Sequence, residues 1–270
     1  MKKPDEIPVV HLEPDCEDYL YRDDYPTGTA LFRECGIFDA TVMAVTDKQA
    51  HEPEAQFNAL SVGCSIGTEV DAIASILRGH DEPDGHLVGL DPNRIALHLA
   101  TLATYGVEYN LEQGKDSLLQ SLESYGFDIT GIDVKLPNHN VGYFGVAART
   151  LRRDHHISFY EGALLPEYAL QEGGSHLVAC NNVLPYILKE EGEDFFTRHI
   201  DGLARQVRPG GILNIGCHPG FFTKSRTAAW GMESYADMHL RASERLTSLY
   251  GLQTVLAHKD TFSVALRRPQ

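Results

Sequence analysis

The sequence is poor in basic residues. Its 270 residues include 23 Lys and Arg against 38 Asp and Glu, which gives a formal net charge of −15 at pH 7. Proteins that bind nucleic acid need a positive field, over the whole chain or over one face, to hold the phosphates. The one cluster of basic residues, Arg149, Arg152 and Arg153, is short. We therefore expect no nucleic-acid partner.

Long apolar runs and paired cysteines are also missing. No stretch approaches the roughly 18 apolar residues of a membrane-spanning helix, and residues 1–6 lack the apolar run of a signal peptide. The five cysteines are an odd number without a C-x-x-C pair, a usage typical of buried thiols in a reducing compartment. None of the 13 histidines stands in a zinc-binding pattern. These absences predict a cytoplasmic protein with no membrane contact and no metal.

From Phe57 onward, short apolar runs alternate with amphipathic segments. This alternation predicts a parallel sheet with helices on both faces, and two strands near the C-terminus predict a closing hairpin. The expected fold class is therefore α/β: a Rossmann-like, seven-stranded, mostly parallel sheet with a C-terminal antiparallel hairpin strand. The expected strands are 57–62, 86–90, 157–160, 176–180, 212–217, 254–257 and 262–266, and the expected helices are 68–77, 93–105, 193–207 and 235–250.

Two regions lie outside this alternation. Residues 1–56 are acidic and aromatic, and we expect them to be helical from about Gly28 to Val45 and to form an N-terminal cap that contributes to a cofactor site. Residues 57–270 form the expected main domain. Within it, residues 107–156 are far longer than a standard crossover. That length predicts a lid or a substrate-binding insertion.

A glycine-containing turn, G-C-S-I-G-T-E from Gly63 to Glu69, joins the first expected strand to the first helix. Gly63 and Gly67 allow a tight turn that a ligand can approach closely, and the N–H groups at the start of the helix favour an anionic group. Asp91 ends the second strand, 24 positions after Gly67, where a carboxylate can accept hydrogen bonds from ribose hydroxyls. Together they predict a nucleoside pocket. The turn departs from G-x-G-x-x-G, which argues against a dinucleotide.

Four separated stretches resemble one family in the same order. They are T-A-L-F-R-E from Thr29, G-C-S-I-G-T-E from Gly63, F-Y-E-G-A-L-L from Phe159 and V-A-C-N-N-V-L-P-Y from Val178. They resemble T-x-F-F-R-E, G-C-S-T-G-E-E, F-x-x-x-N-L-L and I-F-C-R-N-V-x-I-Y of the chemotaxis receptor (CheR-type) methyltransferases. Those enzymes belong to the class I S-adenosylmethionine (SAM) methyltransferases. The seven-stranded, mostly parallel sheet with a C-terminal hairpin strand that we expect here is the arrangement expected of that class.

The resemblance implies SAM as cofactor, with S-adenosylhomocysteine or methylthioadenosine as product. Glu69 would bind the α-ammonium group of SAM, Arg33 its carboxylate through charge-assisted hydrogen bonds, and Thr29 would add a hydroxyl contact. The remaining cofactor-binding residues implied are Gly63, Ser65, Gly67, Asp91, Ala163, Leu164 and Asn181.

The resemblance also implies which positions contact adenine and which are catalytic. Ala163 and Leu164 fall where the family contacts adenine, and Asn181 stands in place of the family's arginine. Asn182 and Tyr186 would end the fourth strand, where the substrate meets the sulfonium, and are the implied catalytic residues.

The sequence also departs from this family. Receptor methyltransferases carry a longer, basic helical domain before T-x-F-F-R-E, whereas here only 28 residues precede Thr29, and this segment is acidic. The receptor substrate is therefore not expected, and methyl transfer to a small molecule is. Two alternatives stay open: an intramolecular cyclase that converts SAM to azetidine-2-carboxylate and methylthioadenosine, and a non-catalytic SAM-binding sensor or partner subunit. A homodimer also stays open.

Overall fold

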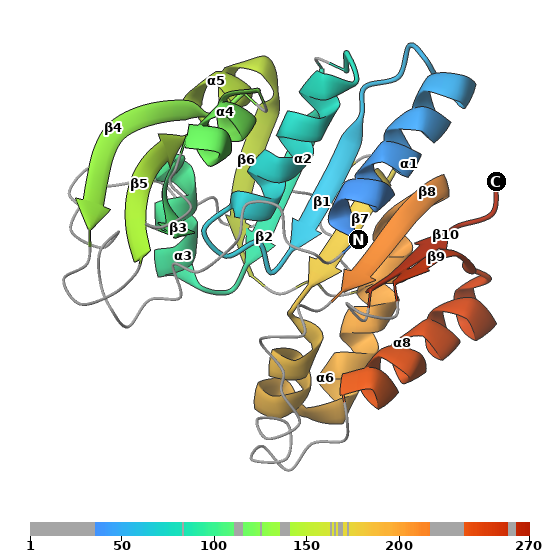
Figure 1. Ribbon diagram of the computed structural model, residues 1–270. Coiled ribbons are helices and arrows are strands. Elements are labelled where there is room, and N and C mark those ends of the chain that lie inside the picture. The colour runs from blue at the N-terminus through green and yellow to red at the C-terminus, as the bar shows by residue number, and fades with distance from the viewer. Residues whose placement is uncertain are drawn as a thin grey trace.

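A computed structural model describes residues 36–82, 84–110, 116–124, 126–135, 141–162, 164, 166, 170–171, 173–216, 235–258 and 263–270. Helices and strands alternate along most of this chain (Figure 1). The helices are α1 (Ile37–His51), α2 (Thr68–Gly79), α3 (Arg94–Leu102), α4 (Asp116–Ser124), α5 (Arg149–Asp154), α6 (Leu184–Gln206) and α8 (Tyr235–Tyr250). The strands are β1 (Asn58–Val62), β2 (His86–Asp91), β3 (Thr104–Asn110), β4 (Asp128–Lys135), β5 (Val141–Ala147), β6 (His156–Glu161), β7 (Ser175–Asn181), β8 (Val207–Gly216), β9 (Gln253–His258) and β10 (Ser263–Arg267).

Seven strands form one sheet in the order β6-β2-β1-β7-β8-β10-β9. The pairs from β6 to β8 are parallel, whereas β10 runs antiparallel to both β8 and β9. The expected α/β fold class, with its Rossmann-like sheet and its antiparallel hairpin strand, is therefore confirmed. The strand order turns back between β1 and β7, and the carboxyl ends of parallel strands at such a point form a crevice.

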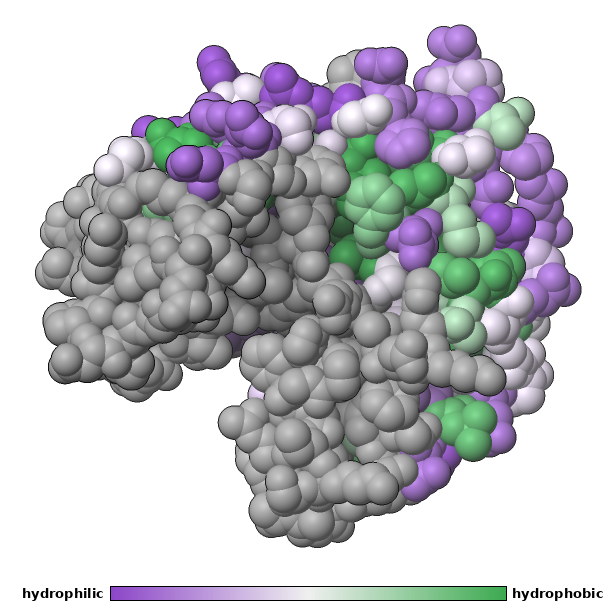
Figure 2. Space-filling view, viewed as in Figure 1, coloured by the Kyte–Doolittle hydropathy of each residue, from purple (hydrophilic) through white to green (hydrophobic). Residues whose placement is uncertain are grey.

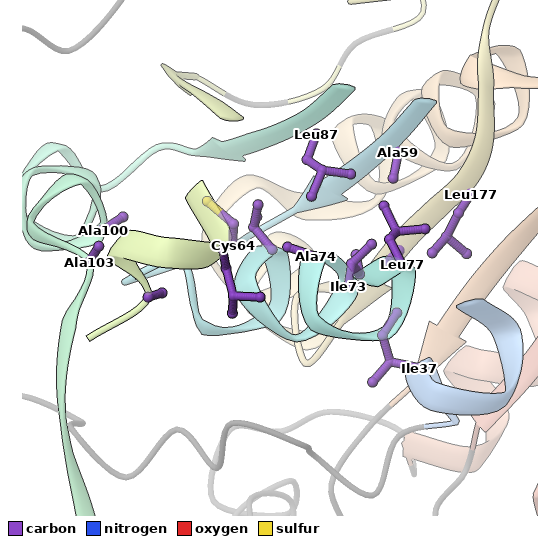
Figure 3. Close-up of a cluster of buried hydrophobic side chains, with 14 of the residues drawn as sticks. Ile37, Ala59, Cys64, Ile73, Ala74, Leu77, Leu87, Ala100, Ala103 and Leu177 are labelled. Atoms are coloured by element: carbon purple, nitrogen blue, oxygen red, sulfur yellow. The ribbon is translucent and has the colours of Figure 1, made fainter. Parts of the chain in front are cut away.

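Apolar side chains cover both faces of this sheet, as expected for strands buried between helices. On one face α2 packs over β1, β2 and β7, with Ile73 and Leu77 directed at Leu87 and Leu177 (Figure 3). Helices α6 and α8 cover the other face, where Leu203 and Leu246 join the core. Both faces of the sheet are therefore buried.

Residues 104–147 build a second sheet in the order β3-β5-β4, which is antiparallel and lies beyond the β6 edge of the large sheet (Figure 1). Helix α5 connects its last strand to β6 and is tied to the main fold by an ion pair. Arg152 donates from Nε and from a terminal nitrogen to the two oxygens of Asp71 on α2, at 2.9 and 2.7 Å. Asp71 is fully buried. The basic cluster noted in the sequence thus has a structural role at Arg152. That these residues form a lid or insertion for substrate stays a prediction.

Three predicted element boundaries are wrong. Helix α3 ends at Leu102, before the predicted Tyr105, because Ala103 adopts a left-handed φ of 54° and turns the chain into β3. Helix α6 begins at Leu184, nine residues before the predicted start, and Gly192 breaks it with a φ of 83°. Strand β8 begins at Val207 and includes the Pro-Gly-Gly that we expected to precede it.

The N-terminal helix also differs from its predicted range. Helix α1 continues to His51, beyond the predicted end at Val45, and it packs against α2, β7 and β8. The predicted start at Gly28 lies outside the described residues. Figure 2 shows hydrophobic residues on the surface around α1 and hydrophilic residues along the upper rim of this view. Across the described part of the chain, no helix has the length and apolar character needed to cross a bilayer.

Candidate functional site

The turn after β1 has three left-handed residues. Gly63, Ser65 and Gly67 have φ values of 71°, 50° and 83°. The N–H of Gly63 donates to the carbonyl of Leu90 on β2 at 2.7 Å, and the N–H of Gly67 donates to Cys64 at 2.9 Å. Gly67 is the N-cap residue of α2 and, as a glycine, provides no side-chain hydrogen bond to the first N–H groups of the helix. The motif found in the sequence is therefore a tightly wound turn at the carboxyl end of β1, where the strand order turns back.

Close packing accounts for both glycines of this turn. A Cβ placed on Gly63 would lie 2.1 Å from Cγ2 of Val183, the residue before α6. A Cβ on Gly67 would lie 3.1 Å from both Ala100 and Phe159. Because these neighbours fill the space beside each glycine, the requirement for glycine follows from packing as well as from the positive φ values.

Asp91 stands at the carboxyl end of β2, as predicted, and is 7% exposed. Its Oδ2 accepts the N–H of Ser65 and its Oδ1 accepts the N–H of Asn93, both at 2.8 Å. Burial raises the pKa of this carboxyl above its usual range, and the two backbone donors partly oppose that rise. The Asp91 carboxylate therefore ties the turn after β1 to the end of β2. Each of its oxygens has a further lone pair that can accept a hydrogen bond from a ligand.

Glu69 projects from the first turn of α2 and is held by two neutral donors. Its Oε1 accepts the hydroxyl of Ser61 at 2.7 Å, and its Oε2 accepts the side-chain amide of Asn181 at 2.5 Å. Ser61 lies on β1 and Asn181 ends β7, so the two strands that flank the switch point converge on this carboxylate. Glu69 and Asn181 are 112 positions apart in the sequence, and the fold brings their side chains within hydrogen-bond distance.

Two further residues extend this cluster and were not identified from the sequence. Asn214 on β8 donates from Nδ2 to Oδ1 of Asn181 at 3.0 Å, and Ser263 on β10 donates to Oδ1 of Asn214 at 3.3 Å. Asn214 is fully buried and Ser263 is 3% exposed. The available signal was an amide in the middle of an otherwise apolar strand, I-L-N-I-G, since buried polar groups require partners.

Two carboxylates, Asp91 and Glu69, lie close to Cys64 in the turn after β1. Cys64 is fully buried, and burial together with the carboxylates of Asp91 and Glu69 raises the pKa of its thiol well above the usual range. The Arg152 guanidinium acts on the same thiol in the opposite direction. Cys64 and Cys180 are both buried and reduced, which confirms the expectation of buried thiols for these two of the five cysteines.

The two predicted catalytic residues lie in different surroundings. Asn182 follows β7, is 9% exposed and has a left-handed φ of 61°, with its N–H donating to the carbonyl of Gly216 at 2.8 Å. A non-glycine residue in this region is strained, and such strain is common at functional sites. Tyr186 does not end the strand as predicted, because α6 begins at Leu184. It lies in the first turn of that helix and is 44% exposed.

Leu164 is fully buried in the core beneath α6, so its side chain contributes packing on that face of the sheet. Its carbonyl lies 3.0 Å from Nδ1 of His199, and Nε2 of His199 lies 3.9 Å from Sγ of Cys180. Burial lowers the pKa of His199 to about 4, so the ring is neutral and donates from Nδ1 to Leu164. The predicted cofactor residues Thr29, Arg33 and Ala163 lie outside the described residues.

Other polar features lie away from this crevice. A cavity of about 230 Å³ at the amino ends of β7 and β8 is lined by residues including Lys48, His176 and Arg208. Burial and the neighbouring Arg208 and Lys48 lower the pKa of His176 to about 4. Within the described ranges, His, Cys, Asp and Glu form no group suited to hold a metal ion.

Comparisons with known proteins give structural neighbours only. No protein-family model matches this chain, and no curated protein matches it. The antibiotic-resistance methyltransferase Kmr is 17% identical, with 85% of this chain and 93% of that chain covered and a TM-score of 0.43. The plantazolicin methyltransferase BpumL, solved with S-adenosylhomocysteine (SAH), is 8% identical, with 87% and 86% covered and a TM-score of 0.46.

A third neighbour is a putative SAM-dependent methyltransferase from Methanococcus maripaludis, 11% identical, with 87% of this chain and 88% of that chain covered and a TM-score of 0.42. At such low identities and scores, these neighbours assign no reaction to this chain. The resemblance to chemotaxis receptor methyltransferases stays a prediction.

Proposed function

We propose that this chain is a SAM-dependent enzyme that transfers a methyl group to a small acceptor molecule. The observation that carries the proposal is the Glu69 carboxylate, held by Ser61 and Asn181 at the switch point of the sheet. SAM carries a sulfonium and an ammonium group, both attracted by fixed carboxylates. In dinucleotide-binding folds the pyrophosphate lies at the start of the first helix, where Glu69 would repel it, so the position of this carboxylate supports SAM over a nicotinamide cofactor.

The geometry supports a division of roles. Glu69 would accept the α-ammonium group, since the neutral donors Ser61 and Asn181 position its carboxylate without neutralising its charge. Asp91 would accept the ribose hydroxyls with the lone pairs left by Ser65 and Asn93. The implied contacts of Thr29 and Arg33 complete the proposal at the methionine carboxylate.

Methyl transfer asks little acid–base chemistry of the protein. The acceptor's lone pair forms a bond to the methyl carbon while the carbon–sulfur bond breaks and leaves SAH. Alignment and exclusion of water supply most of the rate enhancement in such a displacement. Asn182 and Tyr186, at the carboxyl edge of β7 and the start of α6, are the proposed substrate-facing groups. Tyr186 is exposed and can meet an acceptor that enters from solvent.

Binding is tested by calorimetric titration of SAH into the wild-type protein and into Asp91→Ala. We expect the variant to lose about 1–3 kcal/mol of binding free energy, because ribose hydroxyls lose a buried acceptor. Asp154→Ala removes a half-exposed carboxylate on α5 and serves as the control. Unchanged affinity in Asp91→Ala would show that the ribose assignment is wrong.

The reaction is tested by mass spectrometry of products. SAH that forms only with an added acceptor supports methyl transfer. Methylthioadenosine formed from SAM alone would refute methyl transfer and support cyclisation. Tight SAM binding without turnover on any of a panel of acceptors would refute it and support a sensor role.

A further inference from the structure

Four hydrogen bonds connect side chains of four strands to one carboxylate. From the far end, the hydroxyl of Ser263 donates to Asn214, Asn214 donates to Asn181, and Asn181 donates to Glu69. Ser61 supplies the fourth bond, to the other oxygen of Glu69. Every bond in the series from Ser263 points its donor towards Glu69. The positive ends of the amide dipoles therefore all face the carboxylate, an arrangement in which each bond polarises the next.

The direction of the series is fixed by its second member. A side-chain amide has a donor end and an acceptor end. Because Nδ2 of Asn214 faces Oδ1 of Asn181, the amide of Asn181 must present its own Nδ2 to Glu69. Turned by 180°, Asn181 would place its carbonyl oxygen against the carboxylate, which is repulsive. Asn214 thus determines whether Asn181 stabilises or repels Glu69.

The sheet provides room for this series at the cost of apolar packing. Asn214 is in register with Ala179 on β7 and with Ala265 on β10, and both alanines belong to the core beneath α2. Small neighbours leave space for an amide that is fully buried. The fold alone does not require an amide there, because Ile212, Ala179 and Ala265 next to it belong to the apolar core. Buried polar networks are favourable only when every member is satisfied.

We propose that Asn214, supported by Ser263, is a positioning residue that orients Asn181 and Glu69 to receive the cationic amino group of the ligand. This inference rests on the proposed function, since it assigns Glu69 to the amino-acid end of SAM. Asn214 acts through Asn181 and touches no ligand. Its effect is specific to the amino group: adenosine recognition at Asp91 involves a different strand end and does not depend on it.

The test compares two ligands on the full-length chain by calorimetric titration. One is SAH, and the other is its analogue in which hydrogen replaces the α-amino group. Asn214→Leu keeps the side-chain size but removes the donor. We expect the affinity of this variant for SAH to fall about tenfold, as for a lost buried hydrogen bond. Its affinity for the deaminated analogue should change less than twofold. Asn214→Asp should lose more, because an acceptor at this position turns the Asn181 amide around.

Two further variants separate positioning from folding. Ser263→Ala removes only the distal hydroxyl, so we expect a smaller loss that again affects SAH alone. Thr41→Val removes a buried hydroxyl on α1 that donates to Ile37 and should change neither affinity. Equal losses for both ligands in the Asn214 and Ser263 variants, or no loss for either, would overturn the inference. A wild-type chain that binds neither ligand would instead overturn the proposed function.

Discussion

Gly63 offers the most direct test of the turn at the crevice, through the substitution Gly63→Ala. A non-glycine residue at its φ of 71° costs about 1–2 kcal/mol. The new methyl carbon would also lie 2.1 Å from Cγ2 of Val183, and overpacking of this kind costs about 1–3 kcal/mol. The two contributions together predict a loss of about 2–5 kcal/mol in the free energy of unfolding.

A double-mutant cycle separates the two contributions. Val183→Ala removes the methyl group that collides, so the steric part should vanish in the double variant while the φ part remains. We expect the double variant to be less destabilised than the sum of the single variants by about 1–3 kcal/mol. The assay is equilibrium urea unfolding followed by circular dichroism at fixed temperature and pH.

The control for this cycle is Gly79→Ala at the end of α2, where no neighbour lies within 4 Å of the added methyl group. It should raise stability by a few tenths of a kcal/mol, because alanine favours a helix over glycine. Effects of Gly63→Ala and Val183→Ala that simply add would show that the two residues are not in contact, and the packing described for the turn would then be wrong.

Three other changes have defined outcomes. Asp71→Asn leaves the Arg152 guanidinium, 13% exposed, without its charged partner and should cost about 3 kcal/mol in unfolding free energy by urea titration. Burial lowers the pKa of His176 and of His199 to about 4, below the unfolded value near 6.5. The unfolded state therefore binds more protons, and stability should fall as pH drops from 6.5 to 4, by up to about 1.4 kcal/mol per pH unit for each histidine. Tyr186→Phe should lower turnover in a product assay, because the acceptor loses a hydroxyl contact, and should leave calorimetric SAH affinity unchanged.

The first two of these have a control variant, and the last two each have an outcome that would contradict them. Asp154→Asn breaks a half-exposed pair with Arg78 at 3.5 Å and should cost under about 1 kcal/mol. Replacement of His199 by Gln should flatten the pH dependence. Stability that stays level between pH 7.5 and 5 would contradict the neutral, buried rings. A Tyr186→Phe variant with full turnover would remove that residue from the catalytic proposal.

The strands of the large sheet were predictable because each is an apolar run with a clear end. His86–Asp91 and Ser175–Asn181 are examples, and the glycine turn at Gly63 follows from its residues. The sheet of β3, β4 and β5 was not predicted, because its strands pair with one another inside a region with little apolar alternation. The end of α3 was missed since alanine at position 103 carries no sequence sign of a left-handed φ.

The candidate site was predictable to a similar degree. Glu69, Asp91 and Asn181 could be found because each ends a strand or begins a helix at a recognisable motif. Asn214 and Ser263 could not, because their importance depends on which strands become neighbours. Only the order β7-β8-β10 places them one after another beside Asn181. A linear pattern contains no information about that order until the antiparallel return of β10 is known.

The position of β10 links the last segment of the protein to the assembly of the whole sheet. It lies between β8 and β9 although it follows both in the chain. During folding, β9 therefore has no partner until β10 arrives, and β8 exposes an unpaired edge of the kind that promotes aggregation. A truncation before Ser263 would leave this edge open permanently. Such a chain should accumulate in inclusion bodies even though every residue of the glycine turn is intact.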